Sequence, residues 1–505
     1  MLPDAKTPNS PDWWLLRLGA RLGGDIPRMD RLDDYWRGNH PLPFGNMKMR
    51  EAYRKFQKQS KTNFCKLVAE SVVERLKVTG FRTGGDGSET LDKQAWGWWQ
   101  SNHLDADSGL VHRAAIVMSR AYVIVGEDPD KPGQPLVTGE DPRQVIHESS
   151  PTNRRKRLAA LKTWWDDINS RQQAVLYLPD SIHYYRGRTQ KQPPMNMWTQ
   201  AAWEPDVSDD YPDGYAVNTL GEVPVVPFMC CPDLGGNTLG EFEDVLPVQD
   251  RINTEVLDRM VISTMQAYRQ RWATGVDLTD ENGNPAGGFD PGADLLWNVA
   301  DDAAKFGEFQ PADLTSVLKA VEADVQHLAA ITRTPPHYLL GAMVNLSGDA
   351  LSAAETGLTS KVTERSAEFG ESWETVYQLA GMVQGKTVPD DCEVIWQDPQ
   401  FRTLMEMAAA NVQLVTAGVP WRTRMSLLPF TPSQIDRMQS ERASDAMLNS
   451  ILSPPAAPFN APKPAGAPGG AAVPAQAVAR AMGLPAGSAA AERLRPSGPA
   501  ISSQL

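Results

Sequence analysis

Long amphipathic helical runs constrain this chain more than any other feature. One run extends from Gly348 to about Val383, and another from Leu239 to about Trp272. In the first of these runs the large apolar residues recur at intervals of three, four or seven, which places them on one face of a helix. The apolar positions are Leu351, Leu358, Val362, Phe369, Trp373, Val376 and Leu379. At ~1.5 Å of rise per residue such a helix is roughly 50 Å long, so we expect an architecture built on extended helices.

The run that starts at Leu239 carries a proline, Pro247, near its beginning. Proline lacks an N–H, so it either kinks the helix or lies in the first turn of an unbroken helix, where the loss is harmless. A further helical run extends from about Asp313 to Ile331, after a turn-rich cluster with strand candidates at Trp272–Leu278 and Leu295–Val299. We therefore expect two long helices joined through a small β insertion.

The region between residues 110 and 229 has a different pattern. One helix-like run from Leu110 to Arg120 is followed by short β-rich runs bounded by Asp, Pro or Gly, which predicts a mixed α+β domain. The strand candidates are Ala121–Gly126, Gln144–Glu148, Ala159–Trp165, Ala174–Tyr177 and Val223–Met229. The first 104 residues are predicted to be helical, with a loop at Tyr35–Pro43, where Gly, Asn and two prolines break the helix.

The C-terminal part consists of a mainly helical region followed by a tail of biased composition. A break at Pro335-Pro336 precedes the long helix, and a short strand at Glu393–Trp396 and helices at about 400–417 and 432–452 follow it. Ser453–Leu505 is rich in Ala, Pro and Gly and has few large apolar side chains. Such a segment cannot bury enough surface to offset the entropy of ordering, so we expect a mostly disordered tail.

Charge and composition narrow the function classes. The 505-residue chain carries a net charge of −13, whereas a nucleic-acid clamp needs clustered Lys and Arg to neutralise phosphates. We therefore do not expect a sequence-specific DNA-binding protein. The start shows no basic leader with an apolar run, and no stretch of about 18 apolar residues occurs, so we expect neither secretion nor a membrane span. Four cysteines, two of them the vicinal Cys230 and Cys231, are too few for a disulfide framework and favour a reducing compartment.

No motif predicts catalysis, a cofactor or a metal ion. Gly381–Thr387 resembles a phosphate-binding loop, but only three residues lie between its glycines where such a loop needs four, and a helix precedes them, so we interpret it as a helix end. The histidines lack HExxH spacing and no CxxC occurs, which leaves structural zinc unsupported. Asp105-Ala106-Asp107 begins like a calcium loop but has no distal glutamate, so it is interpreted as a helix start.

Five short segments carry a family resemblance. They are Tyr35–Pro41, Tyr177–Ile182, Asn218–Val226, Val248–Asn253 and Ser347–Leu351. In this order they are similar to segments of the portal, or head-to-tail connector, proteins of tailed bacteriophages, of the siphophage type common in phages of actinobacteria. The resemblance covers about residues 10 to 450. One departure is Gly240, because the family usually has a serine before the acidic residue, here Glu241.

The resemblance implies an α+β fold with a portal-like architecture. Its expected parts are a helical N-terminal wing segment at 1–104, a mixed α+β wing at 105–238, stem helices at 239–272 and 313–334, a β-containing clip at 273–312, a channel loop at 335–347, a long wing helix and return strand at 348–399, a helical crown at 400–452 and the disordered tail at 453–505. In the channel loop the residues expected to face DNA are Met343, Val344, Asn345, Leu346 and Ser347.

The resemblance also implies a function without catalysis. The chain would form a homo-oligomer, a ring of twelve at one capsid vertex, through which double-stranded DNA is packaged and ejected with non-specific contacts. Its expected partners are the terminase large subunit, head-completion and connector proteins, the major capsid protein and a scaffold protein, with no membrane. The expected location is the virion, after assembly in the host cytoplasm. The acidic charge agrees with this function, since an acidic wall does not grip a polyanion.

Two alternatives stay open on the sequence alone. The first is a cytoplasmic enzyme with an unrecognised active site in residues 105–229, which requires a pocket of converging carboxylates with perturbed pKa values. The second is a monomeric scaffold or adaptor. The mass of the protein in solution distinguishes both alternatives from the ring, because only the ring has a mass near that of twelve subunits.

Overall fold

The computed structural model describes residues 2, 4–43, 51–83, 89–188, 198–208, 211–267, 271–275, 305–308, 313–341, 348–400, 404–426, 428, 430 and 432–452. Helices and strands are both abundant, which confirms the expected α+β class. The chain divides into two compact units, Met1–Gln439 and Ser440–Leu505. The elements below belong to the first unit, apart from the end of the last helix. The predicted disordered tail lies outside the described residues.

Two antiparallel sheets form much of the first unit. One has the strand order β10-β2-β3, and the other has the order β4-β5-β6-β7-β8 with β9 paired to β7. The strands are β2 Arg120–Glu127, β3 Pro135–Glu140, β4 Val145–Ser149, β5 Arg157–Asp166, β6 Arg171–Tyr177, β7 Ser181–Gly187, β8 Trp203–Pro205, β9 Tyr215–Val217 and β10 Val225–Met229. The five strands that the sequence predicts are present. The other four are too short or too polar to stand out from the pattern alone.

Four helices share the main apolar core with these sheets; three of them pack against the strands directly, and α3 packs against those three helices. They are α1 Pro11–Arg37, α3 Phe64–Val73, α5 Leu104–Met118 and α9 Gly348–Val383. The bounds of α9 agree with the predicted run. Gly385 follows α9 at φ +67°, and the N–H of Lys386 donates to the Gly381 carbonyl at 2.9 Å. The glycine-rich segment is therefore a helix end, as predicted.

A buried histidine, His112 of α5, lies within this core. Its Nε2 accepts the Trp373 indole N–H at 2.9 Å, and its Nδ1 lies 3.2 Å from the Leu76 carbonyl oxygen. These two contacts fix the neutral tautomer with the proton on Nδ1, which donates to Leu76. Burial lowers the pKa of His112 to about 4.

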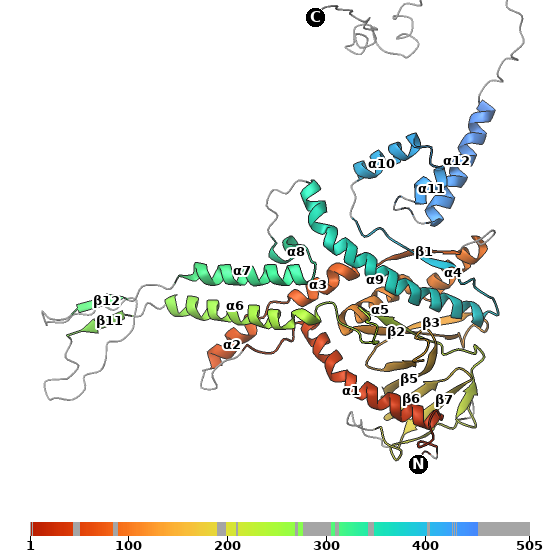
Figure 1. Cartoon of the computed structure of the whole chain (residues 1–505), viewed down its shortest axis with the longest axis horizontal. Coiled ribbons are helices and arrows are strands. Elements are labelled where there is room, and N and C mark those ends of the chain that lie inside the picture. The colour runs from red at the N-terminus through yellow and green to blue at the C-terminus, as the bar shows by residue number, and fades with distance from the viewer. Residues whose placement is uncertain are drawn as a thin grey trace, which may run out of the picture. The chain divides into compact units, whose positions relative to one another are not determined.

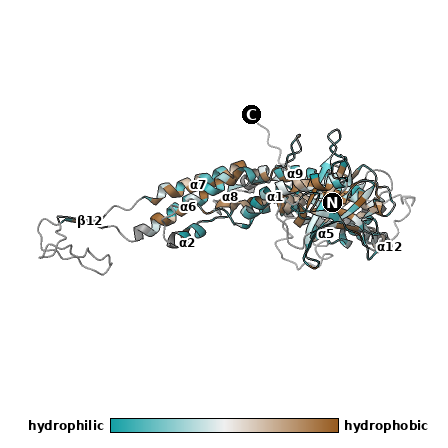
Figure 2. Ribbon diagram, turned by 90° about the horizontal axis from the view of Figure 1, so that it is seen from below, coloured by the Kyte–Doolittle hydropathy of each residue, from teal (hydrophilic) through white to brown (hydrophobic). Residues whose placement is uncertain are grey.

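Helices α6 (Leu246–Ala267) and α7 (Leu314–Ile331) lie side by side and lead to strands β11 (Arg271–Thr274) and β12 (Lys305–Glu308), which pair antiparallel (Figure 1). Polar and apolar stretches alternate along both helices (Figure 2). Asp313 caps α7, because its Oδ1 accepts the N–H of Thr315 at 2.8 Å. This arrangement agrees with the expected pair of long helices with a β insertion between them.

The ends of the predicted run at 239–272 need correction. The helix starts at Leu246, after a 3₁₀ turn at Glu243–Val245, so Pro247 lies in the first turn, where its missing N–H has no cost. The helix ends at Ala267, and Trp272 belongs to β11, where its ring covers Gly307 of β12. A Cβ on Gly307 would lie 2.3 Å from that ring. The strand candidate Leu295–Val299 lies outside the described residues.

The remaining elements include a strand that the sequence pattern does not predict, paired with the short strand that it does predict at Glu393–Trp396. Strand β1 (Val78–Thr83), in the region expected to be helical, pairs antiparallel with β13 (Cys392–Trp396). The other helices are α2 Glu51–Gln59, α4 Glu89–Ser101, α8 Pro336–Leu340, α10 Leu404–Thr416, α11 Trp421–Ser426 and α12 Pro432–Leu452. Part of the predicted loop at 335–347 is thus the short helix α8.

Candidate functional site at the base of the α6–α7 pair

Hydrogen bonds to the last turn of α1 and to the segment that follows it fix the first turns of α6. The Tyr35 hydroxyl donates to the Asp250 carboxylate, with its oxygen 2.8 and 2.7 Å from the two acceptor atoms. The buried His40 donates from Nε2 to the Tyr35 carbonyl at 3.0 Å and accepts at Nδ1 from the Asn253 amide at 3.0 Å. Burial and the Asp250 carboxylate raise the pKa of Tyr35. Two of the family-like segments therefore contact each other here.

Two buried amides of α6 extend this network to the start of α3. Gln249 accepts the Phe64 N–H at 3.0 Å through Oε1, and its Nε2 donates to the Thr62 carbonyl at 2.6 Å. Asn253 Oδ1 accepts the Thr62 N–H at 2.9 Å. A buried polar group left without a partner costs about 1–3 kcal/mol. These amides therefore favour the one orientation of α6 relative to α3 in which all of their hydrogen bonds form.

Another two family-like segments meet at the buried Asn218. Its Nδ2 donates to the carbonyls of Leu178 at 2.8 Å and Glu222 at 2.7 Å, and its backbone N–H donates to the Asp180 carbonyl at 3.0 Å. These bonds join the loop after β6 to the loop before β10. The segments that carry the resemblance therefore act as structural joints between distant parts of the chain.

A charge pair joins α6 to α7. Arg251 donates to both carboxylate oxygens of Asp324, with Nη2 2.5 Å from Oδ1. Bidentate pairs of this kind are the stronger type of ionic hydrogen bond. Hydrogen bonding to the Arg251 guanidinium lowers the pKa of Asp324. His327 Nδ1 lies 3.6 Å from the same carboxylate. The two helices are therefore coupled side by side.

The ends of the two helices that lie away from β11 and β12 converge on a buried lysine of α9, Lys361. Its Nζ donates to the carbonyl of Thr332, the C-cap of α7, at 2.6 Å, and lies 3.0 Å from Oε1 of Glu241, which precedes α6. The Lys361 side chain is 2% exposed. Burial lowers its pKa, and the Glu241 carboxylate opposes that effect. One ammonium group thus ties α9 to the end of α7 and to the segment that leads into α6.

One turn further along α9, Arg365 completes what we call the charge cluster, which is Lys361, Arg365, Glu241, Glu368 and Cys231. Arg365 Nε lies 3.3 Å from Glu241 Oε2, and Nη1 lies 2.8 Å from both Glu368 oxygens. Arg365 Nη2 lies 2.6 Å from the Cys231 sulfur. Two cations face two carboxylates, so the charges, which are costly to desolvate, compensate each other.

Gly240, where the chain departs from the family serine, has a local reason to be glycine. A Cβ there would lie 2.9 Å from the Val117 carbonyl oxygen. The N–H of Gly240 donates to Glu243 Oε2 at 3.0 Å, and Arg28 of α1 binds both oxygens of Glu243 at 2.7 and 2.6 Å. Close backbone approach therefore sets the path of the chain into α6.

The predicted DNA-facing residues Met343, Val344, Asn345, Leu346 and Ser347 lie outside the described residues, so their role stays a prediction. The segment just before them is described. In α8, Leu339 is buried, and the Tyr338 hydroxyl lies 2.6 Å from Arg75 Nη2. The approach to the predicted loop is therefore anchored near the end of α3.

A cleft lined in part by residues of the mixed α+β region tests the enzyme alternative. It has a volume of about 1880 Å³, and its lining takes two carboxylates from residues 105–229, Glu148 and Glu222. Glu148 pairs with Arg17 and Arg21 of α1, and Glu222 pairs with Arg157. Carboxylates held by arginines are the opposite of the converging, perturbed pair that an acid–base enzyme requires. The geometry does not favour that alternative.

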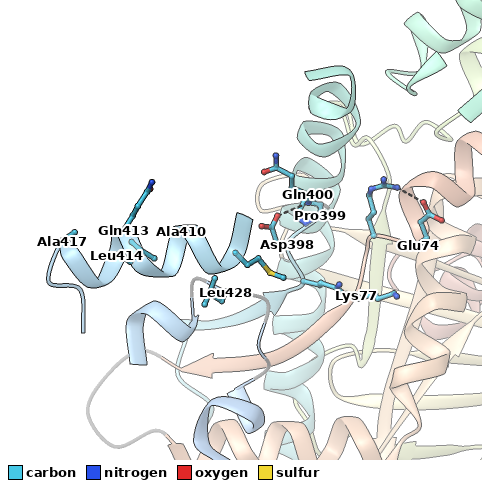
Figure 3. A pocket seen from close by; sticks show the side chains of 13 residues that line it. Glu74, Lys77, Asp398, Pro399, Gln400, Ala410, Gln413, Leu414, Ala417 and Leu428 are labelled. Carbon is cyan, nitrogen blue, oxygen red and sulfur yellow. Dashed lines mark hydrogen bonds and ion pairs between the residues drawn. The ribbon is translucent and has the colours of Figure 1, made fainter. Parts of the chain in front are cut away.

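The second cleft, of about 910 Å³, lies beside α10 (Figure 3). One wall is apolar and comes from α10, with Met407, Ala410 and Leu414. The facing wall is polar and includes Lys77, which precedes β1, and Asp398, which follows β13. An apolar wall opposite a polar one resembles an unfilled packing groove more than a catalytic pocket.

The side chains of this site form ion pairs and hydrogen bonds of buried amides among the described residues. Fold and site together define a structural assembly protein, built on a fixed helix pair that ends in a β hairpin. The chain belongs to the phage portal protein family, SPP1 Gp6-like, whose family model matches residues 21–447.

Two relatives support this membership. The chain is 29% identical over 376 residues to the portal protein of Mycobacterium phage D29, which covers 70% of this chain and 72% of the relative. It is 27% identical over 407 residues to the portal protein of Mycobacterium phage L5, which covers 76% of each. As a phage portal protein the chain is a structural component of the virion at the capsid vertex, and not an enzyme. Across the described residues, every helix is too short or too polar to span a bilayer.

Sequence reasoning does not single out the charge cluster, although one signal was present. Lys361 and Arg365 lie on the apolar face of α9, between Leu358 and Phe369. Charges within an apolar stripe indicate buried pairs, because unpaired charges are almost never fully buried. Their partner Glu241 cannot be identified from spacing, since it lies more than a hundred residues away.

Proposed function

We propose that the chain assembles into a ring of twelve around a channel for double-stranded DNA, with the α6–α7 pairs as its stem. The observation that supports this most is that α6 and α7 are held in place relative to α9 and to each other. Lys361 of α9 binds the C-cap of α7 and Glu241 in the segment that leads into α6, and Arg251 and Asp324 couple the two helices to each other. A channel wall has to keep its shape while a long polyanion moves past it, and helices held in this way meet that need.

The β11–β12 hairpin is proposed as the clip, which docks the terminase motor during packaging and the head-completion proteins afterwards. Its support is its position at the end of the helix pair and its exposed aromatic residues, Trp272 at 39% and Phe306 at 43% exposure. Exposed aromatic side chains are enriched where proteins bind each other. The remaining proposed partners are the major capsid protein and a scaffold protein during assembly in the host cytoplasm.

The ring is tested by measuring the mass of the purified protein with size-exclusion chromatography and light scattering. We expect a mass near twelve times the subunit mass of 55.4 kDa. A closed ring with a different number of subunits would correct only the count. A monomer that stays at the subunit mass at all concentrations would contradict the ring itself and favour the adaptor alternative.

Residues Met343–Ser347 are proposed to touch the moving DNA through sequence-blind contacts, because the segment 335–347 contains no Lys or Arg that could pair with phosphates. Asn345→Lys would place one new positive charge per subunit against a polyanion. We expect assembled heads that package DNA slowly or incompletely, with relief at higher salt.

Asn345→Gln is the matched control, since it lengthens the side chain without adding charge, and it should package normally. Normal packaging by Asn345→Lys would show that the loop does not face the DNA. It would leave the proposed ring intact, because the mass measurement tests the ring separately. Insoluble Asn345→Lys protein would instead favour a packed connection between α8 and α9.

A further inference from the structure

The segment after β10 places two thiols beside a guanidinium group. Cys230 is fully buried, Cys231 is partly exposed, and their sulfur atoms lie 3.8 Å apart. Cys231 has φ +46°, a left-handed conformation that non-glycine residues rarely adopt. In this conformation its sulfur lies 2.6 Å from Arg365 Nη2. The vicinal pair is therefore part of the charge cluster and not simply core packing.

The surroundings of the two thiols make them unequal. A hydrogen bond from Cys230 and the nearby Arg365 charge lower the pKa of Cys231. The same hydrogen bond and complete burial raise the pKa of Cys230. Since the thiolate is the nucleophile, Cys231 is the thiol prepared to react, with a protonated neighbour in reach.

The other two cysteines provide an internal comparison. Cys65 and Cys392 are both buried, and burial raises the pKa of each thiol to about 12. No arginine lowers the pKa of either thiol, and the Asp250 and Glu374 carboxylates raise these pKa values further. These two thiols should be inert under conditions in which Cys231 reacts.

We propose that Cys230 and Cys231 form a reversible oxidation site for hydroperoxides, in which Cys231 attacks the peroxide and is oxidised first, and Cys230 then resolves the oxidised Cys231 as a disulfide. The Cys231 thiolate bonds to one peroxide oxygen, the O–O bond breaks, and the released hydroxide takes a proton to become water. The product is a sulfenic acid on Cys231. Cys230 then loses its proton, and its sulfur displaces the sulfenic oxygen as a second water. Two thiols are oxidised to a disulfide, and one hydrogen peroxide is reduced to two waters.

A metal ion is the main competitor for this site. The sulfur atoms of Cys230 and Cys231 and a carboxylate oxygen of Glu241 lie within 4.8 Å of one another, close enough to share one ion. Both oxygens of Glu241, however, already pair with cations, Lys361 at 3.0 Å and Arg365 at 3.3 Å. An ion here would add positive charge beside two buried cations, which favours the redox assignment.

The proposed disulfide should be easy to reduce. Neighbouring Cα atoms are about 3.8 Å apart, below the range of about 4.4–6.8 Å that unstrained disulfides span. Strained disulfides are the labile ones, so the modification is reversible by ordinary thiols. Oxidation would also remove the sulfur partner of Arg365, and so would act on the cluster that holds the start of α6.

The test uses the full-length assembled protein and hydrogen peroxide. After oxidation, free thiols are blocked with N-ethylmaleimide in denaturant, and peptides are mapped by mass spectrometry. We expect a loss of about 2 Da on the peptide that contains Cys230 and Cys231, reversed by dithiothreitol. Cys231→Ser should abolish this loss, and the control Cys392→Ser should keep it. Cys230→Ser should leave a sulfenic acid on Cys231 that dimedone captures.

A second measurement needs no variant. In the native protein, iodoacetamide should label Cys231 on the order of tenfold faster than Cys65 or Cys392, because only Cys231 has thiolate character. Equal labelling rates, or no mass loss with peroxide, would overturn the proposal. Tight binding of one equivalent of Zn²⁺ that protects both thiols from peroxide would overturn it in favour of a metal site.

Discussion

Replacing Lys361 with methionine tests whether the charge cluster fixes the helix pair. Methionine keeps much of the volume but leaves Glu241 Oε1 and the Thr332 carbonyl without their shared donor. Removing one partner of a buried ion pair costs about 3–5 kcal/mol. Because Arg365 still neutralises Glu241, we expect the lower end, a loss of about 3 kcal/mol in the free energy of unfolding.

The assay is urea unfolding at one fixed protein concentration, since assembly makes apparent stability depend on concentration. The double variant Lys361→Met with Glu241→Gln removes both charges, and we expect it to recover much of the loss. Lys319→Met is the matched control, an exposed lysine on α7 whose replacement should change stability by no more than about 0.5 kcal/mol.

Two results would refute this reasoning. The first is a cost below about 1 kcal/mol for Lys361→Met, the size expected for an exposed pair. The second is a double variant that is less stable than either single variant, because then the two charges would not compensate each other. In either case the α6–α7 pair would owe its fixation to the amide network of Gln249 and Asn253.

The remaining predictions concern the stem helix, the tail and the core histidine. Val256 is a buried residue in the middle of α6, and Val256→Pro should cost about 3 kcal/mol or more per subunit. Size-exclusion chromatography should therefore show no soluble rings for Val256→Pro, whereas the control Val256→Ala should still assemble. Deleting Pro454–Leu505 should leave the ring intact by light scattering, and a monomeric truncation would show that the tail contributes to the interface. Because the pKa of His112 is lowered to about 4, its stabilisation is complete above about pH 6.5 and is lost as the pH falls towards 4, by up to about 3 kcal/mol. This pH dependence is checked by measuring the urea unfolding midpoints of the wild type and of His112→Gln between pH 6.5 and 4. If the variant lost stability as steeply as the wild type, the pH dependence would not come from His112.

Much of the helical framework could be predicted from the sequence. The predicted run and the observed helix agree for α9, since apolar spacing along one helix is a local property of the chain. Pro247 in the first turn of α6 and the glycine end of α9 also follow from backbone chemistry that acts within a few residues. The family resemblance likewise rests on short local segments, and the family is confirmed.

Tertiary structure decided what those local rules do not contain. Strand β1 forms because β13, more than three hundred residues away, supplies its hydrogen-bond partners. Lys361 is stable in the core only where Glu241 and the Thr332 carbonyl reach it, and the pKa of Cys231 is lowered only where Cys230 and Arg365 lie beside it. The physical reason is common to all three. The free energy of a buried strand edge, charge or thiolate depends on which distant groups replace water around it, and the fold alone sets those neighbours.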